Sequence, residues 1–367
     1  MNDLPVTLKD VAAMAGVHPA TVSRALNPET RLLVSDETAD RILAAADSLG
    51  YRPNTVARSL RTRRSNTVGV LIPDLNNPLF PPIVRGIEDR LAANGYVALI
   101  GNTDADDDRE RLVFEGMRDR HVDGFVFATA RLRSPLLAEA AAAGLCVVLV
   151  NRHAEGYGFP AVSVDNEQGI AMAVAHLAAL GHGKIAHVAG PQDVSTGLSR
   201  YRGFVAAMAA HDLAVEPEMV AYASAYSIEE GERCCGELLE TGCTAIAAGN
   251  DMLAVGCYVA LETAGLSCPG DISVVGFNDM PFMDRLTPPL TSVSFAHYEV
   301  GKEAGRLILE QIARGGARGS GGGGAAGGAG GEISADPQVH YLAPELKVRG
   351  STGPPANVAV GARRRVG

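Results

Sequence analysis

Apolar residues follow helical spacing over the first fifty positions of the chain. Four of them, at i, i+3, i+4 and i+7, predict a first helix that begins at Leu8. Gly16 predicts a tight turn after it, and a second short helix covers residues 19–26, where a proline in the first turn costs no hydrogen bond. A third apolar stripe predicts a helix that follows Ser35 and ends at Gly50. The pattern therefore predicts a small all-α domain.

After residue 66, short continuous apolar runs alternate with amphipathic segments. The runs form two series, 67–72, 96–100, 125–128 and 147–150, followed by 185–189, 245–247 and 272–277. Strands that are apolar throughout and separated by helices are typical of parallel sheets covered on both faces. The sequence thus predicts an α/β domain of two doubly wound lobes, with a ligand site in the cleft at the carboxyl ends of the strands.

Length and charge agree with this division. The 367 residues suffice for two domains, and 47% hydrophobic residues suffice for a packed core. Residues 1–64 carry nine Lys or Arg and seven Asp or Glu, a net charge of +2, whereas the whole chain carries −10. Five arginines and no acid lie between Arg52 and Arg64. A basic end joined to an acidic body is expected when only that end approaches phosphate.

Three features bear on location. No apolar run reaches the ~18 residues that a membrane span needs. The first residues show no basic stretch followed by an apolar one, so we expect neither export nor membrane association. The six cysteines form no CxxC pair, and we interpret them as buried thiols of a cytoplasmic protein.

The N-terminal helices have the spacing of a helix-turn-helix motif, whose second helix enters the major groove of DNA. The polar face of that helix contains Pro19, Ala20, Thr21 and Arg24. Arg24 suits a guanine edge through two hydrogen bonds, and Ala20 suits a thymine methyl group. Spacing alone leaves a second interpretation open, a generic three-helix bundle with a solvated Arg24.

The DNA-binding signature of the LacI/GalR family of bacterial transcription regulators resembles five runs in this chain, Thr7–Ala12, Ala15–Val17, Ala20–Asn27, Leu49–Asn54 and Ala57–Leu60. The resemblance extends over about residues 6–353. One departure is a loop at residues 28–34 that is one or two residues longer than usual, from which we expect little consequence.

The resemblance implies three parts. Residues 1–52 form the helix-turn-helix domain, residues 53–65 form a hinge helix and linker, and residues 66–353 form a two-lobed effector-binding and dimerisation domain that looks like the periplasmic sugar-binding proteins. The residues implied to contact DNA are Thr7, His18, Pro19, Ala20, Thr21, Ser23, Arg24, Asn27, Tyr51, Asn54, Ala57, Arg58, Leu60 and Arg61.

In the family the hinge helix is implied to fold only when paired with its dimer mate on DNA, with a leucine wedged into the minor groove. Leu60 stands at that position. A segment with three arginines between Arg58 and Arg63 and few apolar residues does not order alone. The alternative is a basic flexible linker.

No catalytic motif is present in the body. It lacks a dinucleotide fingerprint after the first strand, a P-loop, a G-x-S-x-G elbow and an H-E-x-x-H motif. We therefore expect neither an enzyme nor a cofactor, and no metal site. The residues that the resemblance implies in effector binding are Leu79, Phe80, Asn151, Arg152, Thr196, Arg200, Tyr226, Asn250 and Asn278. Plain packing of Phe80 or Tyr226, and an internal salt bridge of Arg200, stay open as alternatives.

Asn278 stands where the family usually has aspartate. Asparagine has one acceptor oxygen, adds N–H donors and carries no charge. This makes a neutral or acidic effector easier to accommodate, and Val194, at a position that is charged in purine-binding members, weakens a purine effector. We expect a sugar or sugar derivative, with a sugar acid or other organic acid as the alternative.

Glycine fills eleven of the seventeen positions from 315 to 331, which predicts a flexible insertion, and residues 354–367 are predicted to be a disordered tail. Together these features predict a DNA-binding transcription regulator that binds a pseudo-palindromic double-stranded operator as a homodimer and responds to a small molecule. We expect a repressor, with an activator of the same architecture as the alternative. The sequence does not reveal whether the ligand releases DNA or is required for binding it.

Overall fold

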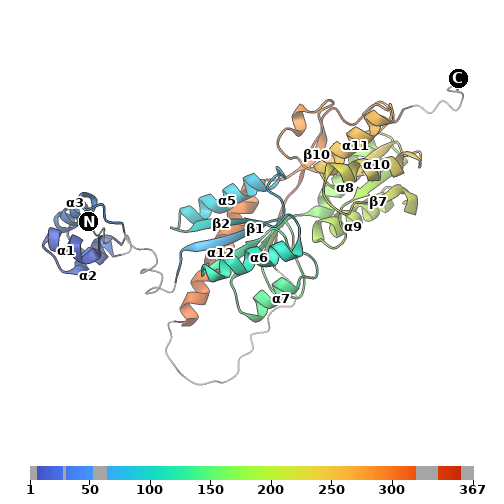
Figure 1. The fold of residues 1–367 in the computed structure, drawn as a ribbon. Coiled ribbons are helices and arrows are strands. Elements are labelled where there is room, and N and C mark those ends of the chain that lie inside the picture. The colour runs from blue at the N-terminus through green and yellow to red at the C-terminus, as the bar shows by residue number, and fades with distance from the viewer. Residues whose placement is uncertain (1–5, 28–29, 53–63, 320–337, 357–367) are drawn as a thin grey trace, which may run out of the picture. The chain divides into compact units, whose positions relative to one another are not determined.

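The computed structural model describes residues 6–27, 30–52, 64–319 and 338–356. It divides at Ser65 into two units, and each is described here by itself. Figure 1 shows the elements of both units.

The first unit contains the three predicted helices, α1 (Leu8–Ala15), α2 (Pro19–Ala25) and α3 (Asp36–Ser48), with a short 3-10 turn η1 (Arg31–Leu33) before α3. Thr7 caps α1, because its N–H and hydroxyl both donate to the Asp10 carboxylate, at 2.8 and 2.7 Å. Gly16 adopts a left-handed conformation with φ of 65°, which permits the tight turn into α2.

A small core joins these helices. Val11, Val22 and Ile42, one from each helix, are completely buried and belong to one hydrophobic cluster. Their side chains exclude water from the centre of the bundle. Because α2 places its buried residues Val22 and Ala25 on this inner side, its opposite face is left for other contacts.

The second unit contains two six-stranded sheets. The first has the order β11-β5-β4-β3-β1-β2, and the second has the order β12-β10-β9-β8-β6-β7. Strands of the first sheet are β1 (Thr67–Ile72), β2 (Val97–Asn102), β3 (Gly124–Phe127), β4 (Val147–Val150), β5 (Ala161–Val164) and β11 (Val339–Leu342). Strands of the second are β6 (Ile185–Ala189), β7 (Val220–Tyr222), β8 (Ala245–Ala248), β9 (Ser273–Asn278), β10 (Thr291–Ser294) and β12 (Glu345–Lys347). All pairs are parallel except β10 with β12.

Helices cover both faces of each sheet, as the continuous apolar strands predicted. They are α5 (Phe80–Ala92), α6 (Asp107–Asp119), α7 (Pro135–Ala142), α8 (Asn166–Ala179), α9 (Ser195–Ala210), α10 (Ile228–Leu239), α11 (Asp251–Thr263) and α12 (His297–Gly319), with 3-10 turns η2 (Pro217–Met219) and η3 (Met283–Arg285). In the first lobe, α5 and the pair α6–α7 lie on opposite sides of β1 and β2 (Figure 1). Val70 of β1 belongs to the core cluster of α5, whereas Leu71 belongs to that of α6 and α7.

The chain crosses between the lobes three times, after β5, after β10 and between β11 and β12. Within the described residues, no helix combines the length and the apolar character that crossing a membrane requires.

Helix α12 continues through Gly319, so residues 315–319 are helical where the sequence predicted the start of a flexible insertion. The correction has a physical reason, since adding residues to an existing helix costs far less than nucleating one, and α12 is anchored against α5. The rest of the predicted insertion, residues 320–331, and the tail beyond residue 356 lie outside the described residues.

Candidate functional site

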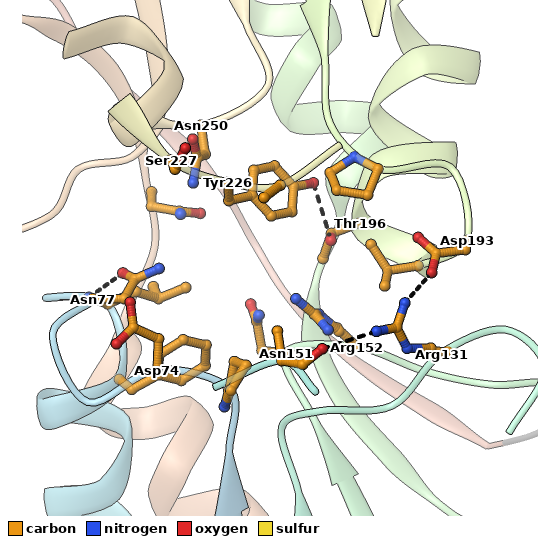
Figure 2. Close-up of a pocket in the computed structure, with 18 of the residues that line it drawn as sticks. Asp74, Asn77, Arg131, Asn151, Arg152, Asp193, Thr196, Tyr226, Ser227 and Asn250 are labelled. Carbon is orange, nitrogen blue, oxygen red and sulfur yellow. Dashed lines mark hydrogen bonds and ion pairs between the residues drawn. The ribbon is translucent and has the colours of Figure 1, made fainter. Parts of the chain in front are cut away.

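A cleft of about 500 Å³ lies between the two lobes, at the carboxyl ends of the parallel strands. All nine residues predicted for effector binding line it, namely Leu79, Phe80, Asn151, Arg152, Thr196, Arg200, Tyr226, Asn250 and Asn278. Figure 2 shows that Asp74, Asn77 and Asn151 of the first lobe face Tyr226, Ser227 and Asn250 of the second. The structure therefore brings together residues that are up to two hundred positions apart in the chain.

Other lining residues were not predicted as ligand contacts. They are Pro73, Asp74, Asn77, Asp104, Ala105, Arg131, Pro191, Asp193, Val194, Ser224, Ala225 and Ser227. Most of them follow directly after β1, β2, β3, β6 or β7. Position after a predicted strand was the signal that could have identified them, because the carboxyl ends of parallel strands share one edge.

Arg200 on α9 is the most buried charged group of the cleft, with 2% of its surface exposed. Its guanidinium donates to the side-chain oxygens of Asn166 (2.8 Å) and Asn278 (3.2 Å) and to the carbonyl of Gly249 (2.6 Å). It also lies 3.7 Å from the centroid of the Phe277 ring. Burial lowers the pKa of Arg200 to about 10, so the cation is retained at neutral pH at a cost in solvation. No ion pair among the described residues includes Arg200, so the predicted alternative of an internal salt bridge is wrong.

Asn278 ends β9 with φ of 109°, a conformation that residues other than glycine rarely adopt. Its side chain is 2% exposed and accepts from Arg200. The positive φ angle is therefore found at a residue that lines the cleft and whose side-chain amide accepts a hydrogen bond from Arg200.

Asn151 and Arg152 follow β4 and line the same cleft. Asn151 also has a positive φ, 65°, and its side-chain oxygen is buried without a hydrogen-bond partner among the described residues. Arg152 is half-buried, donates one long hydrogen bond of 3.4 Å to the Thr129 carbonyl, and has a buried Nε without a partner in the same part of the chain. Burial lowers the pKa of Arg152.

The remaining predicted residues also make hydrogen bonds or packing contacts within the protein. Asn250 caps α11, because its side-chain oxygen accepts from Leu253 N at 2.9 Å, which leaves its amide nitrogen toward the cleft. The Tyr226 hydroxyl donates to Thr196 at 3.2 Å (Figure 2). Phe80 is 2% exposed and belongs to the hydrophobic core as well as to the cleft wall.

Contacts across the mouth of the cleft join the two lobes. Arg131, which follows β3, pairs with Asp193, which follows β6 (Figure 2). The Leu132 N–H donates to the Asp193 carbonyl at 2.8 Å. These two polar contacts join the lobes beside the cleft.

In the first unit, the predicted face of α2 is open to solvent. Ala20 and Arg24 are exposed, and Thr21 and Ser23 are half-buried. His18 caps α2, because its Nδ1 accepts from Ala20 N at 3.2 Å. Tyr51 packs against the core of the unit.

Of the other predicted DNA contacts, Thr7 is exposed at the start of α1, and Pro19 and Asn27 are half-buried at the two ends of α2. Asn54, Ala57, Arg58, Leu60 and Arg61 lie outside the described residues.

Comparison with known proteins covers both units. The family profile described as "Bacterial regulatory proteins, lacI family" matches residues 7–54, and the one described as "Periplasmic binding proteins and sugar binding domain of LacI family" matches residues 65–322. The chain is 34% identical over 310 residues to the ribose operon repressor of Halalkalibacterium halodurans, covering 84% of this chain and 91% of that protein. It is 33% identical over 314 residues to the HTH-type transcriptional repressor CytR of Escherichia coli K12, covering 85% and 91%. The solved cellobiose complex of the transcriptional regulator CelR is similar in fold, with a TM-score of 0.68 at 28% identity over 94% of this chain and 99% of that one.

Proposed function

Because the chain belongs to the LacI family of bacterial regulatory proteins, we propose that it is a repressor that binds its operator as a homodimer and is controlled by a sugar or sugar derivative in the cleft. Its relatives are transcription regulators rather than enzymes. The observation that carries the proposal is the presence, in one chain, of an exposed polar helix face on a helix-turn-helix unit and a polar cleft between two lobes.

DNA recognition is assigned to α2. Arg24 and Ala20 are exposed on this helix, and Arg24 forms no ion pair among the described residues, so its five N–H donors are free of carboxylates. An arginine in the major groove pairs with guanine through two hydrogen bonds, which is the most common sequence-specific contact. Two copies of the unit then read the two half-sites of a pseudo-palindrome.

Exposed apolar side chains on the body support pairing of two copies. Val97 and Ile100 on the edge strand β2 are 66% and 40% exposed, and Leu112 on the neighbouring α6 is 71% exposed. An edge strand with exposed apolar residues favours association, and two-fold symmetry buries the same surface on both subunits. We assign the homodimer contact to this surface. Leu112→Lys should shift the full-length protein from dimer to monomer in sedimentation equilibrium, whereas an unchanged dimer would exclude this surface.

The cleft supplies the means of control. A ligand that contacts both lobes binds one lobe arrangement better than another, and this difference couples ligand binding to DNA binding, typically by 1–3 kcal/mol. The two relatives named for sugar-related roles, a ribose operon repressor and a regulator solved with cellobiose, favour a carbohydrate as the controlling ligand.

The test uses the full chain and an operator selected from random duplex DNA. Arg24→Ala should weaken binding of the selected site by about 1–3 kcal/mol, roughly fivefold to 150-fold, and relax its sequence preference. Arg202→Ala removes an exposed arginine of α9 and serves as the matched control. Equal affinity of wild type and Arg24→Ala for the selected site would contradict the assignment of α2, and an operator complex that no carbohydrate alters would contradict the control by a sugar.

A further inference from the structure

We propose that the controlling ligand is a polyhydroxy acid of the sugar-acid class, whose carboxylate is bound by Arg152 and Arg200. The inference rests on the function proposed above and specifies the chemistry of the same cleft. Four observations carry it.

The first is that, among the described residues, every hydrogen-bond partner of the Arg200 guanidinium is neutral. Three of its five N–H groups donate to two amide oxygens and one carbonyl. Two N–H groups are left, on a cation that is 2% exposed and lines the cleft. A buried cation without a carboxylate partner is costly, so it favours an anionic ligand over a neutral one.

The second is the identity of residue 278. A carboxylate in place of the Asn278 amide would lie within hydrogen-bond distance of Arg200 and would neutralise it, since the two side chains already meet at 3.2 Å. The amide leaves the charge uncompensated and presents N–H donors, which suit a ligand carboxylate. The other nearby buried acid, Asp251, is engaged by the Ser292 hydroxyl and the Met280 N–H and forms no ion pair among the described residues.

The third is the state of Arg152. Its one hydrogen bond among the described residues is long, its Nε is buried without a partner there, and no carboxylate pairs with it in the same part of the chain. Buried donors in folded proteins nearly always have an acceptor. The ligand is the acceptor that the cleft lacks.

The fourth is the ion pairing of the charged groups that line the cleft. Asp104 pairs with Arg109 at 2.5 Å, and Arg131 pairs with both Asp107 and Asp193. Of the described acids that line the cleft, Asp74 is left without an ion pair, and its Oδ1 accepts from a backbone N–H at 2.8 Å. Arg152 and Arg200 are therefore the two arginines of the lining without a carboxylate ion pair among the described residues, and a ligand carboxylate can supply that partner.

The positions of these groups define the shape of the ligand. Asp74 and Asn77 lie together on one side of the cleft, and Arg152 lies beyond Asn151 on the other (Figure 2). Carboxylate and amide oxygens accept hydroxyl protons. A molecule with hydroxyls at one end and a carboxylate at the other satisfies both sides, and a cleft of about 500 Å³ is in the range of small-ligand sites.

The experiment titrates the full-length protein with matched pairs that differ in the acid group, D-ribonate and D-ribose, D-gluconate and D-glucose, D-galacturonate and D-galactose, and with D-ribose 5-phosphate. Calorimetry gives the dissociation constants, and operator release is followed in parallel. We expect at least one acid to bind about tenfold or more tightly than its neutral partner, as a charged hydrogen bond replaces a neutral one.

Variants locate the anion. Arg152→Gln should weaken binding of that acid by about tenfold to a hundredfold, clearly more than it weakens binding of the neutral partner, whereas Arg202→Gln, on the exposed side of α9, should change neither. Asn278→Asp has nearly the same shape and should also weaken the acid by about tenfold, which keeps the test available if Arg152→Gln does not fold.

Three results would overturn the proposal, namely tighter binding of a neutral sugar than of its acid, tighter binding of the phosphate than of any carboxylate, and no binding of any acid at millimolar concentration. In the first two cases, release of the operator by the better ligand would leave the proposed repressor function intact. A ligand of either kind that binds the cleft without altering operator affinity would instead contradict that function.

Discussion

Asp251 gives the protein a pH dependence that the structure allows us to work out. The residue begins α11 and is completely buried. Its carboxylate accepts the Ser292 hydroxyl at 2.5 Å and the Met280 N–H at 2.7 Å. Burial outweighs these hydrogen bonds and raises the pKa of Asp251 to about 7.

The sign follows from comparing the folded and unfolded chains. An unfolded aspartate loses its proton near pH 4, whereas the folded protein keeps it until about pH 7. The stability that protonated Asp251 contributes is therefore fully present below pH 4 and is lost as the pH rises through 7. A displacement of about 3 pKa units corresponds to on the order of 4 kcal/mol, of which about 2–3 kcal/mol falls between pH 5 and pH 8.

Asp251→Asn removes the titration and keeps the shape. The asparagine oxygen can accept from Met280 N, and its NH₂ can donate to the Ser292 hydroxyl oxygen. The chain contains no tryptophan, so urea unfolding is followed by far-ultraviolet circular dichroism, at pH 5, 6, 7 and 8. The stability of the variant relative to wild type should rise by about 2–3 kcal/mol over this range. Both proteins contain the same buried histidines, so subtracting the two free energies of unfolding at each pH removes the contribution of those histidines. A difference in free energy that stays constant with pH would refute the reasoning.

Other contacts give simpler expectations. Burial lowers the pKa of His187 to about 4, so the stability that neutral His187 contributes is present above pH 6.5 and is lost as the pH falls through 4. His187→Phe removes this titration. In urea titrations at pH 4.5 and 7, the variant should therefore lose up to about 3 kcal/mol less stability on acidification than wild type. Gly301→Ala would place a Cβ 1.9 Å from a backbone oxygen of α5 and should cost about 3 kcal/mol in thermal unfolding, whereas Gly236→Ala, with open space around the new Cβ, should be neutral or stabilising. Asp193→Asn should cost less than about 1 kcal/mol, because Arg131 and Asp193 are 35% and 52% exposed, and a loss above 2 kcal/mol would show that the pair is stronger than a surface ion pair.

The cleft was predictable from the sequence to the extent that its residues follow apolar runs. Asn151 and Asn250 end such runs, and the parallel arrangement of the strands brings them to one edge. The resemblance to a known family added Arg200 and Tyr226, which lie within or before helices and carry no strand signal of their own.

The features of the structure that the sequence could not predict depend on contacts between segments far apart in the chain. Arg131 and Asp193 come from different lobes, so neither position identifies the other as its partner. The neutral environment of Arg200 results from three segments that meet only in the folded lobe. The continuation of α12 to Gly319 depends on its packing against α5, which local propensity does not include.

Distant contacts also connect the two lobes near the cleft, where the proposed function places effector control. Arg200 in the second lobe donates to Asn166, which begins α8 just after the chain crosses from β5. The amide of Asn166 donates to the Ser163 hydroxyl at 3.4 Å, and that hydroxyl donates to the carbonyl of Asn151 at 3.0 Å, in the first lobe. Under the proposed function, a ligand that contacts both Asn151 and Arg200 meets both ends of this hydrogen-bonded chain. Such a ligand contacts both lobes, so in the proposed function its affinity differs between lobe arrangements, and this difference couples its binding to that of DNA.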